Sequence, residues 1–224
     1  MTPVPPAYVG LWKRTLLETP SKRDTTTQVF WLQTQSWHAD IRVPADRPAL
    51  SGHTSLEHVS SDELLALARQ QGFAGTTEVD GDVCRWHRKL DYQPPSGSND
   101  VGRMRFETPD RVLEFGVEQE YYEVWERVPS SGENWVRQMD EPDGTPTVLL
   151  GLEPWFMFVR PRHATLPRAE ALGALVASTA SDAARRELLD FEISLGRRGI
   201  DGTQRIELST LPWREGQLLN NVKK

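Results

Sequence analysis

Three polar side chains share a predicted strand face with aromatic residues, and they are the groups of this sequence best placed for binding chemistry. The pairs are Gln33 with Trp31, Arg88 with Trp86, and Glu123 with Trp125. An arginine on an apolar strand face is costly to bury without an acidic partner. That partner could be the carboxylate of a ligand or Glu123. Alternatively, Arg88 lies in water at the mouth of a barrel.

Five tryptophans fall on separate predicted strands: Trp31, Trp37, Trp86, Trp125 and Trp155. Several of them facing inward would line an aromatic cavity suited to a flat or apolar ligand. The alternative is that they pack on one another and fill the core, because each buries a large area. The residues expected to bind a ligand are Trp31, Gln33, Trp37, Trp86, Arg88, Tyr122, Glu123 and Trp125.

The remaining chemically active residue types form no recognisable catalytic or metal-binding pattern. His53 and His58 lie in one predicted loop, without the spacing of a zinc site. His38 and His87 are expected on outward strand faces, and the lone thiol of Cys84 is expected to be buried and inert. Phosphate-loop, nucleophile-elbow and dinucleotide motifs are absent, so no catalytic residue, metal or cofactor is predicted.

The composition excludes several classes of protein. The 224 residues carry a net charge of −6 with acids and bases intermixed, which argues against a nucleic-acid partner. A single cysteine permits no intrachain disulfide, so a cytoplasmic location is expected. The longest apolar run, residues 155–159, is far too short to cross a membrane.

Short strands with tight turns dominate the chain. Residues 37–43 alternate between apolar side chains and the polar set His38, Asp40 and Arg42, which is typical of a half-buried strand. Asp80-Gly81 indicates a hairpin, and Ser60 with Glu63 caps a helix over residues 61–71. Two further helical segments are predicted at residues 168–177 and 182–188.

These elements predict a mainly β fold of ten or eleven strands. An antiparallel meander closes into a lipocalin-like barrel, with two or three short peripheral helices. One domain spans residues 1–224, with residues 1–7 as an extended lead-in and residues 215–224 as a tail.

Gly10-x-Trp12 on the first strand resembles the signature of lipocalins and related calycins. There the tryptophan plugs one end of the barrel and an arginine from the last strand packs over it, which implies Arg205 or Arg214 as that partner here. Residues 30–34, 40–44 and 123–126 are similar to a lipocalin-like family of uncharacterised bacterial proteins, distantly similar to a fungal kinase-interacting lipocalin-like protein. The resemblance implies a fold and no particular reaction.

The sequence therefore predicts a cytoplasmic barrel that binds a small apolar or aromatic ligand. One alternative is an enzyme on the same scaffold, of the isomerase, cyclase or dehydratase type, for which paired inward acids and bases would be the sign. Another is a protein-interaction barrel with a filled core. The oligomeric state is left open.

Overall fold

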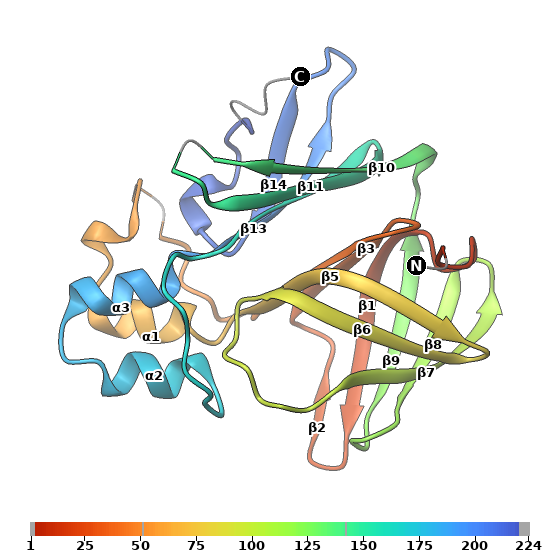
Figure 1. Ribbon diagram of the computed structural model, residues 1–224, viewed down its shortest axis with the longest axis horizontal. Helices are drawn as coiled ribbons and strands as arrows, with labels where there is room; N and C mark the ends of the chain where they lie inside the picture. Colours follow the sequence, from red (N-terminus) through yellow and green to blue (C-terminus); the bar gives the residue numbers. More distant parts are fainter. Residues whose placement is uncertain (1–2, 51, 142, 220–224) are drawn as a thin grey trace.

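Residues 10–128 form a closed antiparallel barrel of eight strands (Figure 1). The computed structural model describes residues 3–50, 52–141 and 143–219. The strand β9 pairs with β1 and closes the barrel, and the short strand β2 (Lys22–Asp24) folds back on the end of β1. The barrel strands, in order, are β1 (Gly10–Thr19), β3 (Gln28–Gln33), β4 (His38–Val43), β5 (Gln71–Asp80), β6 (Val83–Asp91), β7 (Asp100–Thr108), β8 (Arg111–Gly116) and β9 (Tyr122–Val128). The predicted barrel is confirmed.

A second antiparallel sheet of five strands follows the barrel in the chain. It runs in order through β10 (Ser131–Asp140), β11 (Pro146–Glu153), β12 (Trp155–Arg160), β13 (Glu192–Arg198) and β14 (Gln204–Ser209). The sequence places these strands in the barrel itself. They lie outside it because the β1–β9 pairing leaves the barrel no free edge to extend.

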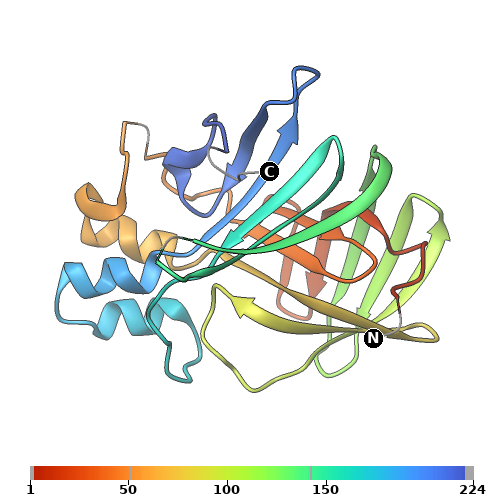
Figure 2. The same ribbon diagram turned by 45° about the horizontal axis from the view of Figure 1, so that its top comes forward.

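Three short α-helices lie together at one side of the molecule in both views (Figures 1 and 2). They are α1 (Ser61–Leu67), α2 (Leu172–Ser178) and α3 (Asp182–Leu189), with single 3₁₀ turns η1 (Leu56–His58) and η2 (Pro212–Arg214). The predicted capping box is confirmed, since the Ser60 side chain accepts from the Glu63 amide and Glu63 caps the Ser60 amide in return. The helix ends at Leu67, earlier than predicted, because β5 begins at Gln71.

The largest hydrophobic core lies between the barrel wall and the second sheet. Leu32 and Ile41 point outward from β3 and β4 and pack in one cluster with Leu150 and Ile193 of the second sheet. The barrel wall is therefore apolar on its outside here, where a solvent-exposed wall would be polar. The description of residues 1–224 as one domain stays a prediction. Among the described residues, no helix is long and apolar enough to cross a membrane.

This second sheet reverses the expected orientation of β4. The polar residues of β4, His38, Asp40 and Arg42, face the barrel interior, and His38 and Asp40 are 0% and 1% exposed. The prediction that His38 faces outward is wrong. Strict alternation shows that two faces differ, but a strand covered on both sides can turn its polar face inward.

One end of the barrel is closed by the N-terminal segment and an arginine. The Trp12 indole nitrogen donates to the Tyr8 carbonyl oxygen at 2.8 Å, and the guanidinium carbon of Arg127 lies 4.1 Å from the centroid of the Trp12 ring. Arg127 belongs to β9, the last strand of the barrel. The expectation of Arg205 or Arg214 over Trp12 is wrong because Arg205 lies in β14 of the second sheet and Arg214 lies in the turn η2 that follows it.

Candidate functional site: a charged cavity at the open end of the barrel

Four tryptophans fill the closed half of the barrel, and we call them the aromatic cluster. They are Trp12, Trp31, Trp86 and Trp125, all less than 10% exposed. The ring centroid of Trp31 lies 6.3 Å from that of Trp12, 5.6 Å from that of Trp86 and 5.8 Å from that of Trp125. These distances and their stacked and edge-on geometries are those of packed aromatic side chains. Of the predicted ligand-binding residues, Trp86 and Trp125 therefore both pack against Trp31.

Gln33 links the aromatic cluster to His38 through a buried chain of hydrogen bonds. Its amide oxygen accepts from the Trp31 indole nitrogen at 3.2 Å and from the Thr77 hydroxyl at 2.8 Å. Because Thr77 donates to Gln33, it accepts from Nδ1 of His38 at 2.9 Å. Burial, followed by the charge of Arg88, lowers the pKa of His38 to about 3, so this imidazole is neutral. Its Nε2 is buried without a hydrogen-bond partner among the described residues.

Two other predicted residues lie outside the barrel interior. Trp37 is half-buried against the core beneath the second sheet, with the Lys89 ammonium 5.1 Å from its ring centroid. Tyr122 is half-buried beside Phe115, with ring centroids 5.3 Å apart. Neither side chain lines the cavity described next.

A cavity of about 800 Å³ occupies the opposite, open end of the barrel. Its wall comes from strand ends of the barrel, from the loops at residues 93–99 and 118–120, and from the segment after β12. Of the predicted ligand-binding residues, Arg88 and Glu123 line it. We call it the open-end cavity.

The charge of Arg88 is neutralised by two nearby carboxylates. Its guanidinium contacts the Asp100 carboxylate at 2.8 Å and the Asp91 carboxylate at 3.2 Å, and it stacks on Phe73 at 3.8 Å from the ring centroid. The alternative of an Arg88–Glu123 pair is therefore wrong, since the ion-pair partner of Glu123 is Arg14, at 2.6 Å.

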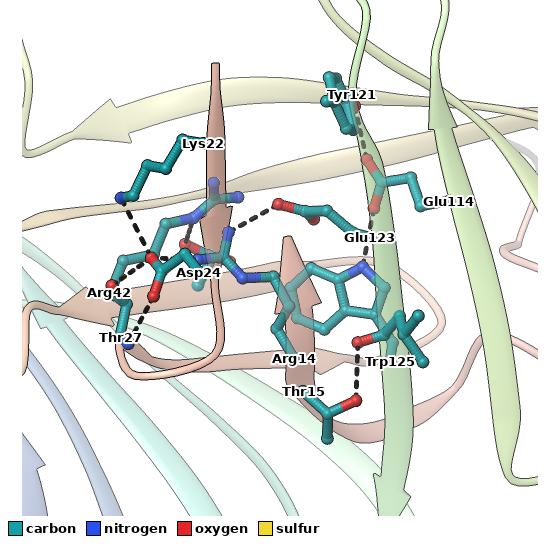
Figure 3. Close-up of polar contacts among 12 residues, drawn as sticks. Arg14, Thr15, Lys22, Asp24, Thr27, Arg42, Glu114, Tyr121, Glu123 and Trp125 are labelled. Carbon is teal, nitrogen blue, oxygen red and sulfur yellow. Dashed lines mark hydrogen bonds and ion pairs between the residues drawn. The ribbon is translucent and has the colours of Figure 1, made fainter. Parts of the chain in front are cut away.

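Arg14 and Asp24 anchor Glu123 from the side of β1 and β2. Arg14 bridges Glu123 and Asp24, the latter at 3.7 Å, with all three side chains almost fully buried (Figure 3). Burial opposes ionisation of Asp24, but hydrogen bonds from Thr27, the backbone at residue 26 and Lys22 outweigh it and hold its pKa far below the usual range. Asp24 is therefore a fixed negative charge that holds Arg14 in place.

Glu114 on β8 lies directly opposite Glu123 on β9 in the strand register. Both side chains face the interior, and directly opposite residues have Cβ atoms about 5 Å apart. Glu114 accepts from the Tyr121 hydroxyl at 2.6 Å and from the Trp125 indole nitrogen at 3.0 Å (Figure 3). It has no arginine partner among the described residues, unlike Glu123.

These surroundings keep a proton on Glu114 near neutral pH. Burial, followed by the negative charge of Glu123, raises the pKa of Glu114 to about 8. Burial also raises the pKa of Glu123, although Arg42 and Arg14 favour its ionised form. A neutral carboxylic acid beside an arginine-paired carboxylate can act as a proton donor and acceptor pair, or it can bind a cation.

Arg162 forms another part of the wall. Its terminal nitrogens donate to the carbonyl oxygens of Asp91 and Tyr92, at 3.3 and 2.7 Å, and it lies 4.8 Å from the Phe191 ring centroid. These contacts fix the loop after β6 to the second sheet. No group of three or more histidine, cysteine or acidic side chains is arranged to hold a metal ion within the part of the chain that the structure describes.

Sequence reasoning missed Arg14, Asp24 and Glu114. Two of them had a usable signal, because Arg14 follows Trp12 by two residues and Glu114 follows Val112 by two, so each shares a strand face with an apolar residue. Asp24 had none, since its role depends on the fold of β2 against β1.

Comparisons with known proteins bear on the fold alone. No family model and no curated protein matches the chain. The crystal structure of the uncharacterised protein YLR301w from Saccharomyces cerevisiae is similar, with a TM-score of 0.57 and 14% sequence identity over 96% of this chain and 91% of that one. The similarity extends over nearly the whole chain, so it includes the second sheet as well as the barrel.

Proposed function

We propose that this protein binds a small polar molecule in the open-end cavity. The observation that carries the proposal is the convergence of three ionisable side chains, the half-buried Arg42 and the buried Glu114 and Glu123, on one cavity of about 800 Å³. Binding sites for small molecules fall in this range of volumes and use a few fixed polar groups for orientation. Arg88, held by two carboxylates and stacked on Phe73, is a rigid contact for the same ligand.

The proposed ligand is polar, whereas the sequence favours an apolar or aromatic one. The apolar expectation depends on tryptophans lining the cavity, and Trp31, Trp86 and Trp125 instead pack within the aromatic cluster. Buried charges desolvated by an apolar ligand would lose their contact with water and gain nothing in return. A ligand with hydrogen-bonding groups replaces that water.

A relationship to lipocalins stays a proposal. Its support is a closed barrel with one open end and the Gly10-x-Trp12 signature with Arg127 over the indole ring. A cytoplasmic location also stays a prediction, supported by Cys84 as a lone, buried thiol. That the protein binds neither nucleic acid nor a membrane is likewise a prediction.

A ligand screen tests the proposed function. Small sugars, amines, amino acids and carboxylic acids are compared with an apolar fluorescent probe by thermal shift and calorimetry. We expect at least one polar class to bind, and we expect Arg88→Gln to weaken it. The matched control is Arg103→Gln, since Arg103 lies exposed on the neighbouring strand in an ion pair with Asp82. Binding of the apolar probe alone, or equal effects of both variants, would contradict the proposal.

An acid–base enzyme on the same scaffold is the second candidate. The observation that favours it is Glu114, which carries a proton at neutral pH and bonds the Tyr121 hydroxyl beside the ionisable Glu123. Such a set could move a proton to and from a bound substrate. Mass spectrometry of polar metabolite mixtures incubated with the protein tests this. A substrate consumed by the native protein and left intact by Glu114→Gln would support it, and no consumption would contradict it.

A further inference from the structure

The wall of the open-end cavity carries more negative than positive groups. Four cationic side chains, Arg42, Arg88, Lys89 and Arg162, stand against seven carboxyl groups. Excess charge of one sign in a cavity with low-dielectric walls raises the local concentration of ligands of the opposite sign. The imbalance therefore favours a positively charged ligand.

The arginines inside the barrel are already committed. Arg88 forms ion pairs with both Asp91 and Asp100, and Arg14 forms ion pairs with both Asp24 and Glu123. Each guanidinium can neutralise one carboxylate, so the Arg88 group retains one negative charge when fully ionised, whereas Lys22 pairs with Asp24 at 3.2 Å and balances the Arg14 group. Arg42 is paired with Asp40 at 2.8 Å, which leaves no arginine for Glu114.

A second, independent feature is an unused acceptor inside the barrel. Oδ2 of Asp40 is buried and has no hydrogen-bond partner among the described residues, while Oδ1 accepts from Arg42. Asp40 is 1% exposed and faces the barrel interior from β4, directly beside the Arg42 that lines the cavity. A buried carboxylate oxygen without a donor is costly, so it favours a ligand that brings hydrogen-bond donors.

We propose that the ligand carries a positively charged nitrogen, of the ammonium type, that binds between Glu114 and Glu123 inside the barrel. This inference rests on the proposed ligand-binding function and specifies its chemical class. The ammonium group supplies donors to both carboxylates, and its charge takes the place of the proton on Glu114. Glu114 enters the complex ionised, and its proton passes to the solvent.

The groups around Glu114 agree with this exchange. Glu123 on β9 and Asp100 on β7 disfavour its ionised form, whereas Arg42 on β4 favours it. The Tyr121 hydroxyl and the Trp125 indole bond its two oxygens from the side of β9. Burial and the two neighbouring carboxylates together outweigh Arg42 and keep Glu114 protonated. A bound cation would supply the positive charge that the ionised form of Glu114 lacks.

A matched set of three five-carbon probes tests the inference by calorimetry near neutral pH. They are the diamine cadaverine, the diol of the same length and the dicarboxylate glutarate. We expect cadaverine to bind roughly tenfold or more tightly than the diol, and glutarate to bind most weakly. We expect its binding heat to depend on the buffer, as one proton is released per complex.

Two variants complete the test. Glu114→Gln keeps the side-chain shape, because its amide can accept from Trp125 and donate to Tyr121, and it should lose the proton release and roughly tenfold of the affinity. Glu78→Gln, at an exposed position outside the cavity, should change neither. Tighter binding of the diol or glutarate would overturn the cation inference and leave a polar-ligand function standing. Buffer-independent heats in the native protein would also overturn it, without any variant. Failure of the whole broad screen would instead overturn the proposed function.

Discussion

Replacing Glu114 by glutamine should stabilise the protein at alkaline pH. The folded protein holds the Glu114 proton up to a pKa of about 8, from an ordinary value of 4.5. Between these values the folded state binds more protons than the unfolded state, so stability falls as the pH rises through this window. Glutamine has no proton to lose, so the variant escapes that loss.

The size of the effect follows from the pKa. Each pKa unit corresponds to about 1.4 kcal/mol, so the rise from 4.5 to about 8 sets a ceiling of about 5 kcal/mol. Local relaxation around the Glu114–Glu123 pair lowers this figure, and we expect Glu114→Gln to gain on the order of 2–4 kcal/mol over the native protein between about pH 5 and pH 9.

Urea unfolding, followed by tryptophan fluorescence across this pH range, measures the difference. The free energies of unfolding of the two proteins should diverge as the pH rises, with the variant the more stable. Glu78→Gln is the control, because Glu78 is exposed and lies outside the cavity. Its curve should run parallel to that of the native protein. A parallel curve for Glu114→Gln as well, or a relative gain by the native protein at alkaline pH, would refute the reasoning.

Three further predictions concern groups inside the barrel and at its closed end. The pKa of His38 is lowered from 6.5 to about 3, so the stability that the neutral imidazole contributes to the folded state is lost as the pH falls below 6.5. His38→Asn should therefore lose less stability than the native protein between about pH 7 and pH 4, as measured by urea unfolding. Arg127→Met removes the cation above Trp12 together with the hydrogen bonds from Arg127 to the carbonyl oxygens of Ala7 and Val9, and it should cost about 1–2 kcal/mol, read as a lower melting temperature; an unchanged melting temperature would contradict the view that Arg127 holds this end of the barrel closed. Asp24→Ala leaves the buried Arg14 with Glu123 alone and should cost about 2–4 kcal/mol, measured by denaturant unfolding, whereas a neutral result would show that Asp24 does not anchor Arg14.

The strand β4 shows how far sequence patterns reach in this protein. The alternation over residues 37–43 correctly predicts a strand and its two faces. It cannot tell which face is inside the barrel, because that depends on whether another layer covers the outside. The second sheet is that layer, and it turns Asp40 and Arg42 into interior groups.

The arginine that closes one end of the barrel also depends on parts of the chain that are distant in sequence. Trp12 was identifiable from its short signature, and an arginine over its ring was expected from the resemblance. Which arginine fills that role depends on which strand pairs with β1. The pairing of Leu11 with Val128 makes β9 the last barrel strand and selects Arg127.

The candidate site was predictable in part. Arg88 and Glu123 were identified from polar residues on aromatic faces, and both line the open-end cavity. Their partners were not, because Asp100 and Arg14 come from strands whose register only the closed barrel defines. Of the five tryptophans expected to face inward, Trp31, Trp86 and Trp125 pack together inside the barrel, whereas the other two pack against the core beneath the second sheet. Their role as ligand contacts stays a prediction.

Titration of the Glu114 carboxyl group by carbon-13 NMR is the most direct test of the charged-cavity account. In the free protein we predict that this group titrates at about pH 8. With cadaverine bound, the ammonium group should stabilise the carboxylate and move the titration to below neutral pH. A Glu114 carboxyl group that titrates at its ordinary value of 4.5, with or without the diamine, would contradict the account.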